Sequence, residues 1–213
     1  MVSSNSQNNN TALGHYALQY NTGNNNSALG YEAYLFNIYS YSNSTALGAQ
    51  TSITASNQIR LGNASVSSIG GQVGWTTISD ARFKKDISET VPGLTFIKKL
   101  RPVTYHMDMD ALASFYHTPD SLRLRESETL KASILQTGFI AQEVEQAAKE
   151  SGFDFSGVDK PKNSEDHYGL RYAEFVVPLV KGMQEQQVII EEMKKQLDIQ
   201  QKEIAELKSM INK

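Results

Sequence analysis

The chain has no cysteine, and its first third has almost no charge. Without cysteine it can form no disulfide and offers no thiolate to a metal ion. The first 78 residues contain one acidic residue, Glu32, and one basic residue, Arg60, and every other charged residue follows Ile78. Such an abrupt change of composition is typical of two different structures joined at a boundary.

The sequence also lacks the features of membrane and nucleic-acid-binding proteins. No apolar run approaches the roughly 18 residues that span a bilayer. A net charge of −3 and an isoelectric point near 5.8 leave no basic footprint for nucleic acid. The opening MVSSNSQNNN has neither the basic nor the apolar region of a signal peptide. We therefore expect neither kind of partner, and we expect a piece of a longer protein whose targeting signal lies upstream.

No group of side chains has the spacing of a metal or cofactor site. The glycines at 70, 71 and 74 lack the lysine and serine that complete a phosphate-binding loop. The histidines are too scattered to match a metal-binding pattern; they are His15, His106, His117 and His167. We expect no cofactor and no metal.

Residues 11–48 contain an internal repeat with the pattern Thr/Ser-Ala-Leu-Gly. Its copies begin at Thr11, Ser27 and Thr45, and a weaker echo begins at Ile59. Short apolar steps between asparagine and glycine turns are typical of brief strands that stack by repetition. One unit cannot bury its own apolar face, so the units must stack, and we expect three chains to combine.

The alternative for this region is a disordered Asn/Ser/Gly linker. Aromatic side chains argue against it, because disordered segments contain few of them; they are Tyr16, Tyr20, Tyr31, Tyr34, Phe36, Tyr39 and Tyr41. The segments Asn10–Leu18 and Asn26–Ala33 resemble the head repeats of trimeric bacterial adhesins and phage tail fibres. The resemblance implies that residues 1–64 are an all-β stalk, a β-roll or β-solenoid of three chains.

After a glycine-rich linker at 65–78, residues 79–175 predict an α+β domain. Leu94, Ile97 and Leu100 indicate a short helix, and Pro102 ends it. The remaining expected elements are a strand at 103–105, a charged helical excursion at 108–133 broken at Pro119, a short strand or loop at 137–140, a helix at 141–150 ended by Gly152, and a polar loop at 153–168.

Residues 176–213 predict a trimeric coiled coil, because apolar residues alternate at spacings of three and four. One core position holds Val176, Met183, Ile190, Leu197, Ile204 and Ile211, and the other holds Leu179, Gln186, Met193, Gln200 and Leu207. Isoleucine at the first position and inner glutamines favour three strands in a fixed register. The alternative is an amphipathic helix packed on its own domain, which the polar flanks disfavour. Pro178 should mark the first turn or a kink.

The boundary itself, Ile78–Ile87, places a serine five residues before a lysine. In the simpler interpretation Ser79 and Asp80 only cap a helix. Ser79 and Lys84 can meet only if the segment turns between them, or across chains, because this spacing separates them in a helix or strand. If they meet, a neutral Lys84 can act as the base for a Ser79 nucleophile.

Lys84 must first lose its proton. Burial beside Ile78, Phe83 and Ile87 would favour that loss, whereas Asp80 and Asp86 would oppose it. Burial on assembly is therefore the expected trigger. Attack on the carbonyl of Ile78 closes a five-membered ring, whereas a cut after Ser79 would need a different or interchain geometry.

Four motifs occur in the order found in one family: Ser79–Ile87, Leu100–Tyr105, Gly138–Val144 and Tyr172–Glu174 with its coil. They resemble the C-terminal intramolecular chaperone, auto-processing domain of phage tailspikes, tail fibres and endosialidase, which the myelin regulatory factor also carries. The resemblance implies a domain that trimerises, directs the folding of the β-rich stalk before it, and cuts itself off with a Ser-Lys pair. Residues 108–133 look like an insertion.

We therefore expect a homotrimeric folding module that is also a single-turnover serine endopeptidase acting on its own chain. Ser79 is the expected nucleophile and Lys84 its base, with Ile78 and Asp80 flanking the cut. The upstream stalk is the folding client, on a phage tail fibre or a bacterial surface. The alternative is a non-enzymatic adhesin or fibre tip in which this domain is a permanent trimerisation foot.

Overall fold

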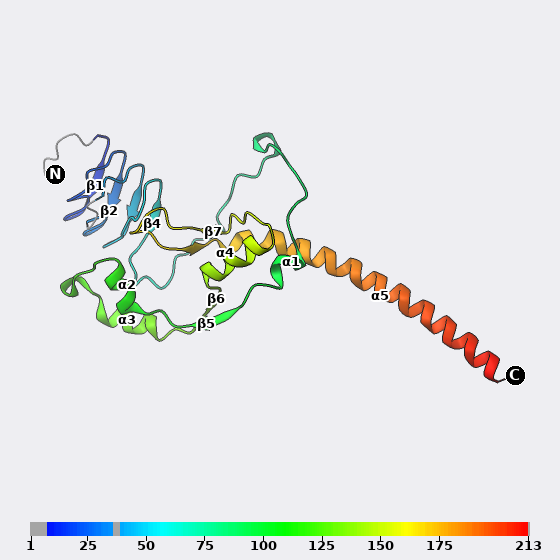
Figure 1. The fold of residues 1–213 in the computed structure, drawn as a ribbon. Helices are drawn as coiled ribbons and strands as arrows, with labels where there is room; N and C mark the ends of the chain where they lie inside the picture. The colour runs from blue at the N-terminus through cyan, green and yellow to red at the C-terminus, as the bar shows by residue number, and fades with distance from the viewer. Residues whose placement is uncertain (1–7, 36–38, 213) are drawn as a thin grey trace. The chain divides into compact units, whose positions relative to one another are not determined.

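The computed structural model describes residues 8–35 and 39–212, so Phe36 and the first seven residues lie outside the described part. The fold is mixed α/β and ends in one long helix, as the sequence predicts. Figure 1 shows the short strands near the N terminus and this helix near the C terminus.

The chain divides into two compact units that interleave along the sequence. The first unit combines the residues up to Ile78 with Val103–Gly138 and Lys160–His167. The second unit contains Ser79–Pro102, Phe139–Asp159 and the residues from Tyr168 onward. Each unit therefore contains segments from several parts of the chain.

The repeat forms a four-stranded parallel sheet in the first unit, in the order of the chain (Figure 1). Its strands are β1 (Thr11–Leu13), β2 (Ser27–Leu29), β3 (Thr45–Leu47) and β4 (Ile59–Leu61). Equivalent residues pair, with Ala12 opposite Ala28 and Ala28 opposite Ala46. The weak echo at Ile59 is therefore a true fourth strand, paired with β3.

The turns of the repeat depend on left-handed backbone at fixed places. The asparagine two residues before each strand has a positive φ: Asn9, Asn25, Asn43 and Asn57. Each strand is followed by a glycine with positive φ, and at Gly14 (φ +133°) a Cβ would lie 2.3 Å from the carbonyl oxygen of Gly30. Asparagine and glycine tolerate this conformation, which explains why the repeat is rich in both.

The inserted segment of the first unit is helical and broken near Pro119, as predicted. It contains α2 (Met109–Phe115), the 3-10 turn η2 (Asp120–Leu122) and α3 (Arg125–Ala132). An antiparallel pair brackets these helices, formed by β5 (Val103–Tyr105) and β6 (Gln136–Gly138).

The second unit has an aromatic and aliphatic core around Phe96, Val144 and Phe175. Its elements are η1 (Ala81–Phe83), α1 (Leu94–Ile97), α4 (Ala141–Glu150), β7 (Val158–Asp159), β8 (Gly169–Leu170) and η3 (Tyr172–Phe175). The α4 bounds match the prediction, and Gly152 follows with φ +63°. The predicted polar loop at 153–168 is wrong in part, because its middle forms β7 and pairs with β8.

The C-terminal helix α5 spans Val176–Ile211, with Pro178 in its first turn. Its start packs on α1, where Glu185 Oε2 accepts a hydrogen bond of 2.7 Å from the backbone N–H of Leu94. Every described residue from Gln186 onward is exposed. In this part of α5, the apolar core positions of the heptad are therefore not buried by the rest of the described chain.

Candidate functional site

The boundary between the repeat and the α+β elements is an exposed segment. Residues 66–90 are exposed except for the half-buried Asp80. The only regular structure in it is η1, a single 3-10 turn. The candidate site therefore lies on accessible chain in a single protomer.

This turn brings Ser79 and Lys84 together. Asp80 caps it, since its side chain accepts a hydrogen bond from the backbone N–H of Arg82, and the chain then reverses before Lys84. Lys84 Nζ donates a hydrogen bond of 2.9 Å to Ser79 Oγ. The segment thus turns between the two residues within one chain, and the capping residue is Asp80 rather than Ser79.

Arg82 pairs with the carboxylate of Asp80. Its guanidinium donates to Asp80 from both Nε (3.0 Å) and Nη2 (2.6 Å). This pairing lowers the pKa of Asp80 below its ordinary value and raises the pKa of Arg82. Of the two carboxylates expected to compete with Ser79 for Lys84, Asp80 and Asp86, the first is therefore already paired.

The apolar neighbours of the pair are not buried in the single chain. Ile78, Phe83 and Ile87 expose 81%, 72% and 75% of their surface, and Trp75 exposes 90%. The desolvation expected from these side chains therefore needs a further surface that covers them.

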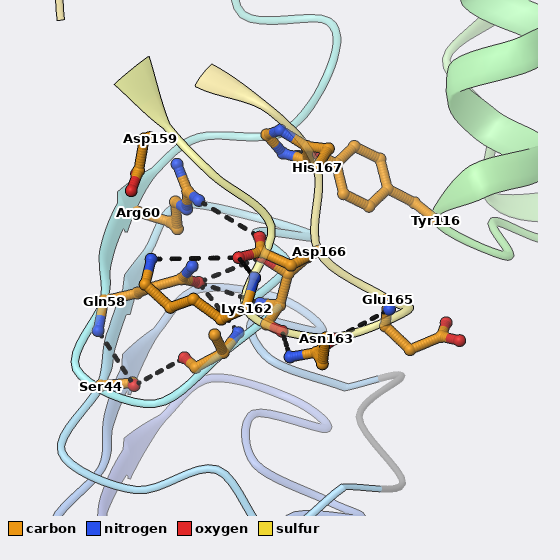
Figure 2. A network of polar contacts seen from close by, with 12 residues as sticks. Ser44, Gln58, Arg60, Tyr116, Asp159, Lys162, Asn163, Glu165, Asp166 and His167 are labelled. Carbon is orange, nitrogen blue, oxygen red and sulfur yellow. Dashed lines mark hydrogen bonds and ion pairs between the residues drawn. The ribbon is translucent and has the colours of Figure 1, made fainter. Parts of the chain in front are cut away.

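A second polar cluster, which sequence reasoning missed, surrounds Asp166 in the first unit (Figure 2). Its side chain is only 2% exposed. Asp166 Oδ1 accepts a hydrogen bond of 2.6 Å from Thr54 Oγ1, and Oδ2 accepts one of 3.1 Å from the backbone N–H of Lys162. Arg60 lies at 4.0 Å from the same carboxylate. These contacts join the end of the repeat to the loop 160–167.

Gln58 stiffens the repeat side of this cluster. Its Oε1 accepts hydrogen bonds from the backbone N–H groups of Thr54 and Ala55 and from the Thr54 hydroxyl. Among the described residues, its Nε2 is the only buried side-chain nitrogen or oxygen atom without a hydrogen-bond partner. Two backbone donors fix the orientation of this amide, so Thr54 is held in place for Asp166.

The pKa of Asp166 lies below its ordinary value of 3.8. Burial alone would raise it, but hydrogen bonds from Thr54 and from the backbone of Lys162 and His167, together with the charge of Lys162, lower it. The ionised carboxylate therefore stabilises the fold fully above about pH 5, and this stabilisation is lost as the pH falls through 3.8 and below.

We predict that Asp166→Asn lowers the melting temperature at pH 7 by about 3 to 10 °C, because it weakens a charge-assisted hydrogen bond. The difference from the parent should shrink as the pH falls below 4 and disappear below the lowered pKa of the folded protein, where the parent carboxylate is also protonated. Thermal melts of both proteins between pH 3 and pH 8 measure this. A difference that does not change with pH would contradict the role of the charge.

One signal in the sequence points to this cluster. Arg60 is the single lysine or arginine of the first 78 residues. A lone cation in an uncharged segment calls for an acidic partner, and only the fold identifies it as Asp166, which lies more than one hundred residues further along the chain.

Within the described residues, no three candidate metal ligands gather, and no helix is long and apolar enough to cross a membrane. Two of the histidines contact side chains of the first unit: His117 lies 3.3 Å from Glu165, and His167 lies 2.9 Å from the Tyr116 hydroxyl.

Comparison with protein families gives a match for part of the chain. The model of a family named as a peptidase and described as "Chaperone of endosialidase" matches residues 79–153. The match begins at Ser79 and includes the Ser79–Lys84 pair, α1 and α4, but neither the repeat nor α5. No curated protein matches the chain.

Proposed function

We propose that residues 79–153, which match the family model described as "Chaperone of endosialidase", belong to an intramolecular chaperone domain that assembles three chains, assists the folding of the repeat before it, and then cuts the chain at Ser79. The client is a β-solenoid stalk of a phage tail fibre or a bacterial surface fibre. The observation that carries the proposal is the 2.9 Å hydrogen bond between Lys84 Nζ and Ser79 Oγ.

The cut begins with attack of Ser79 Oγ on the carbonyl carbon of Ile78. A neutral Lys84 takes the hydroxyl proton, the new C–O bond closes a five-membered ring, and the Ser79 nitrogen receives a proton as the C–N bond breaks. The product is an ester between Ile78 and the Ser79 side chain. Water then hydrolyses this ester to a carboxylate on Ile78 and a free Ser79 hydroxyl.

This chemistry predicts a single cleavage point. The C-terminal fragment should begin with Ser79, and the N-terminal fragment should end with Ile78. Intact mass measurement and N-terminal sequencing of the two fragments check this. A C-terminal fragment that begins with Asp80 would contradict attack on the Ile78 carbonyl.

Assembly supplies the burial that the lysine needs. In water the charged form of an exposed lysine is favoured, and it cannot accept a proton from serine. Trp75, Ile78, Phe83 and Ile87 are exposed apolar side chains of the same segment, and a neighbouring chain can cover them. Covering them would remove water from Lys84 and favour its neutral form.

Two further apolar surfaces support a trimer. In the repeat, Leu13, Leu29 and Leu47 are 67%, 49% and 37% exposed at equivalent positions of successive strands. Along α5, the core positions of the heptad are also exposed, including Ile190 and Ile204. Parallel chains would bury both surfaces in one assembly.

The pairing of Arg82 with Asp80 yields a prediction about rate. Arg82→Gln should release Asp80 to compete for Lys84 and slow cleavage by about two- to fivefold, the size expected for an exposed charge pair. Lys85→Gln is the matched control, because it removes an adjacent cation without releasing Asp80. Band intensities on denaturing gels over time measure both rates, and equal rates would contradict the role of Arg82.

A second candidate is a non-enzymatic fibre tip with this domain as a permanent trimerisation foot. The exposure of Ser79 and Lys84 in the single chain favours it, because solvent stabilises the charged lysine. A denaturing gel of the purified protein separates the two candidates. Two fragments support self-cleavage, and one intact band supports the permanent foot.

A further inference from the structure

Cutting the chain before Ser79 would leave parts of the first compact unit on both fragments. That unit contains the repeat, but it also contains Val103–Gly138 and Lys160–His167, which follow the cut in the sequence. The C-terminal fragment therefore retains two segments that pack with the N-terminal fragment.

The contacts of Asp166 cross the cut. Thr54 Oγ1 donates to Asp166 Oδ1, and the carbonyl oxygen of Thr54 accepts a hydrogen bond of 2.8 Å from Asn163 Nδ2. Thr54 and Arg60 belong to the N-terminal fragment, whereas Asn163 and Asp166 belong to the C-terminal one. Breaking this set would require the buried carboxylate and the buried Thr54 hydroxyl to exchange good partners for water.

The helical insertion adds contacts of the same kind. Gln50 Nε2 donates to the carbonyl oxygen of Leu122 at 3.1 Å, and Lys131 Nζ donates to the carbonyl oxygen of Val66 at 2.6 Å. Side chains of α2 and α3 also line a cavity of about 170 Å³ together with the end of the repeat. The insertion and the loop thus contact the same part of the repeat, residues 50–66.

We propose that the loop 160–167 is a latch that binds the last unit of the repeat non-covalently, with the α2–α3 insertion as its second arm, so that the two fragments remain bound after the chain is cut. The latch takes one partner, the folded end of the repeat, which it recognises through the Thr54 hydroxyl and carbonyl and through the cation of Arg60. Release is then a separate step from cleavage. This inference deepens the proposed function and rests on it for the cut itself.

The latch also depends on the folded form of its partner. Thr54 presents its hydroxyl to Asp166 while Gln58 holds its backbone, and Gln58 in turn accepts these bonds only in the closed turn between β3 and β4. An unfolded repeat offers no such arrangement, and the carboxylate would keep its water. The latch therefore distinguishes a finished repeat from an unfinished one.

The test uses the full chain and an added protease, so that it does not depend on self-cleavage. A recognition sequence for a site-specific protease, flanked by short glycine–serine linkers, is placed between Gly70 and Gly71 in a Ser79→Ala background. Both glycines are exposed, and a Cβ at Gly70 would touch nothing within 4 Å. After digestion, gel filtration over a dilution series measures the fraction of the N-terminal fragment that co-elutes with the C-terminal one.

We expect the digested parent to co-elute at micromolar concentration. Asp166→Ala and Thr54→Val should each weaken the complex by about tenfold to one hundredfold, as expected for loss of a hydrogen bond to a charged group. Thr54→Val keeps the shape of the side chain, so it remains informative if Asp166→Ala disturbs folding. Because both variants remove the same bond, their double variant should be no weaker than the worse single one.

Glu165→Gln is the matched control. Glu165 is the neighbouring carboxylate of the same loop (Figure 2). It contacts His117, which also follows the cut. The Glu165→Gln variant should leave the affinity between the two fragments unchanged. Fragments of the parent that separate at tens of micromolar would overturn the latch. It would also be overturned if the Asp166→Ala and Thr54→Val fragments bound as tightly as those of Glu165→Gln. Neither result would bear on whether Ser79 cuts the chain.

Discussion

Replacing Ser79 with alanine is expected to give a folded, full-length protein that yields no fragments. The parent should give bands of about 8 and about 15 kDa, in proportion to a chain of 23.6 kDa cut after residue 78. Without Oγ there is no nucleophile, and loss of such a group slows catalysis by about 10³-fold or more. Lys84→Ala should have the same effect, because it removes the atom 2.9 Å from that oxygen.

The chain offers matched controls for both residues. Ser88 is an exposed serine of the same segment, hydrogen-bonded to Thr90, and Lys85 adjoins Lys84. Ser88→Ala and Lys85→Ala should cut at the parental rate. Circular dichroism should be unchanged in all four variants, because these side chains are exposed. Fragments from Ser79→Ala or Lys84→Ala at the parental rate would show that the assignment is wrong.

Replacing Ile190 with aspartate is expected to abolish both assembly and cleavage, although Ser79 and Lys84 are untouched. Ile190 lies on the exposed seam of α5. In a parallel trimer three aspartates would be buried together at this level, without partners for their charges. Without assembly the apolar side chains of the segment, including Ile78 and Phe83, stay exposed, so the burial on which the proposed proton transfer depends is missing.

Gln184→Asp is the control for this variant, because it introduces the same charge on an exposed position outside the two core positions of the heptad. It should assemble and cut like the parent. Analytical ultracentrifugation gives the oligomeric state, and denaturing gels give the cleavage rate. If Ile190→Asp monomers cut as fast as the parent, cleavage by Ser79 and Lys84 would not depend on assembly.

Periodicity, repeats and turn residues predicted those helices and strands whose signal lies within the element itself. The helix Ala141–Glu150 was predicted with both bounds, because its apolar face is periodic and Gly152 can adopt the left-handed backbone that follows it. The strand at Ile59 was predicted from a partial match to the repeat and is confirmed. In contrast, β7 and β8 have two residues each, too few for any periodicity to reveal them.

The Ser79–Lys84 pair and the cluster around Asp166 also differ in how local their sequence signals are. Spacing alone placed Ser79 and Lys84 apart unless the chain turned, and the turn follows from a neighbouring residue, because Asp80 caps it at Arg82. The contact between Thr54 and Asp166 joins residues 112 positions apart. No pattern along the sequence encodes such a pair, because it arises from how two separate segments pack.

The hydrogen bonds that we assign to the latch fall on residues 50–66, and Tyr41, which follows β2, also lies beside Asn163 and Glu165 of the loop. The sequence of β1 and of the turn that follows it can therefore vary without altering the surface that we propose the latch binds. A chaperone domain of the kind that we propose should be exchangeable between fibres. Grafting residues 50–213 onto a different stack of parallel strands should transfer the proposed chaperone domain together with the repeat residues 50–66 that the latch binds.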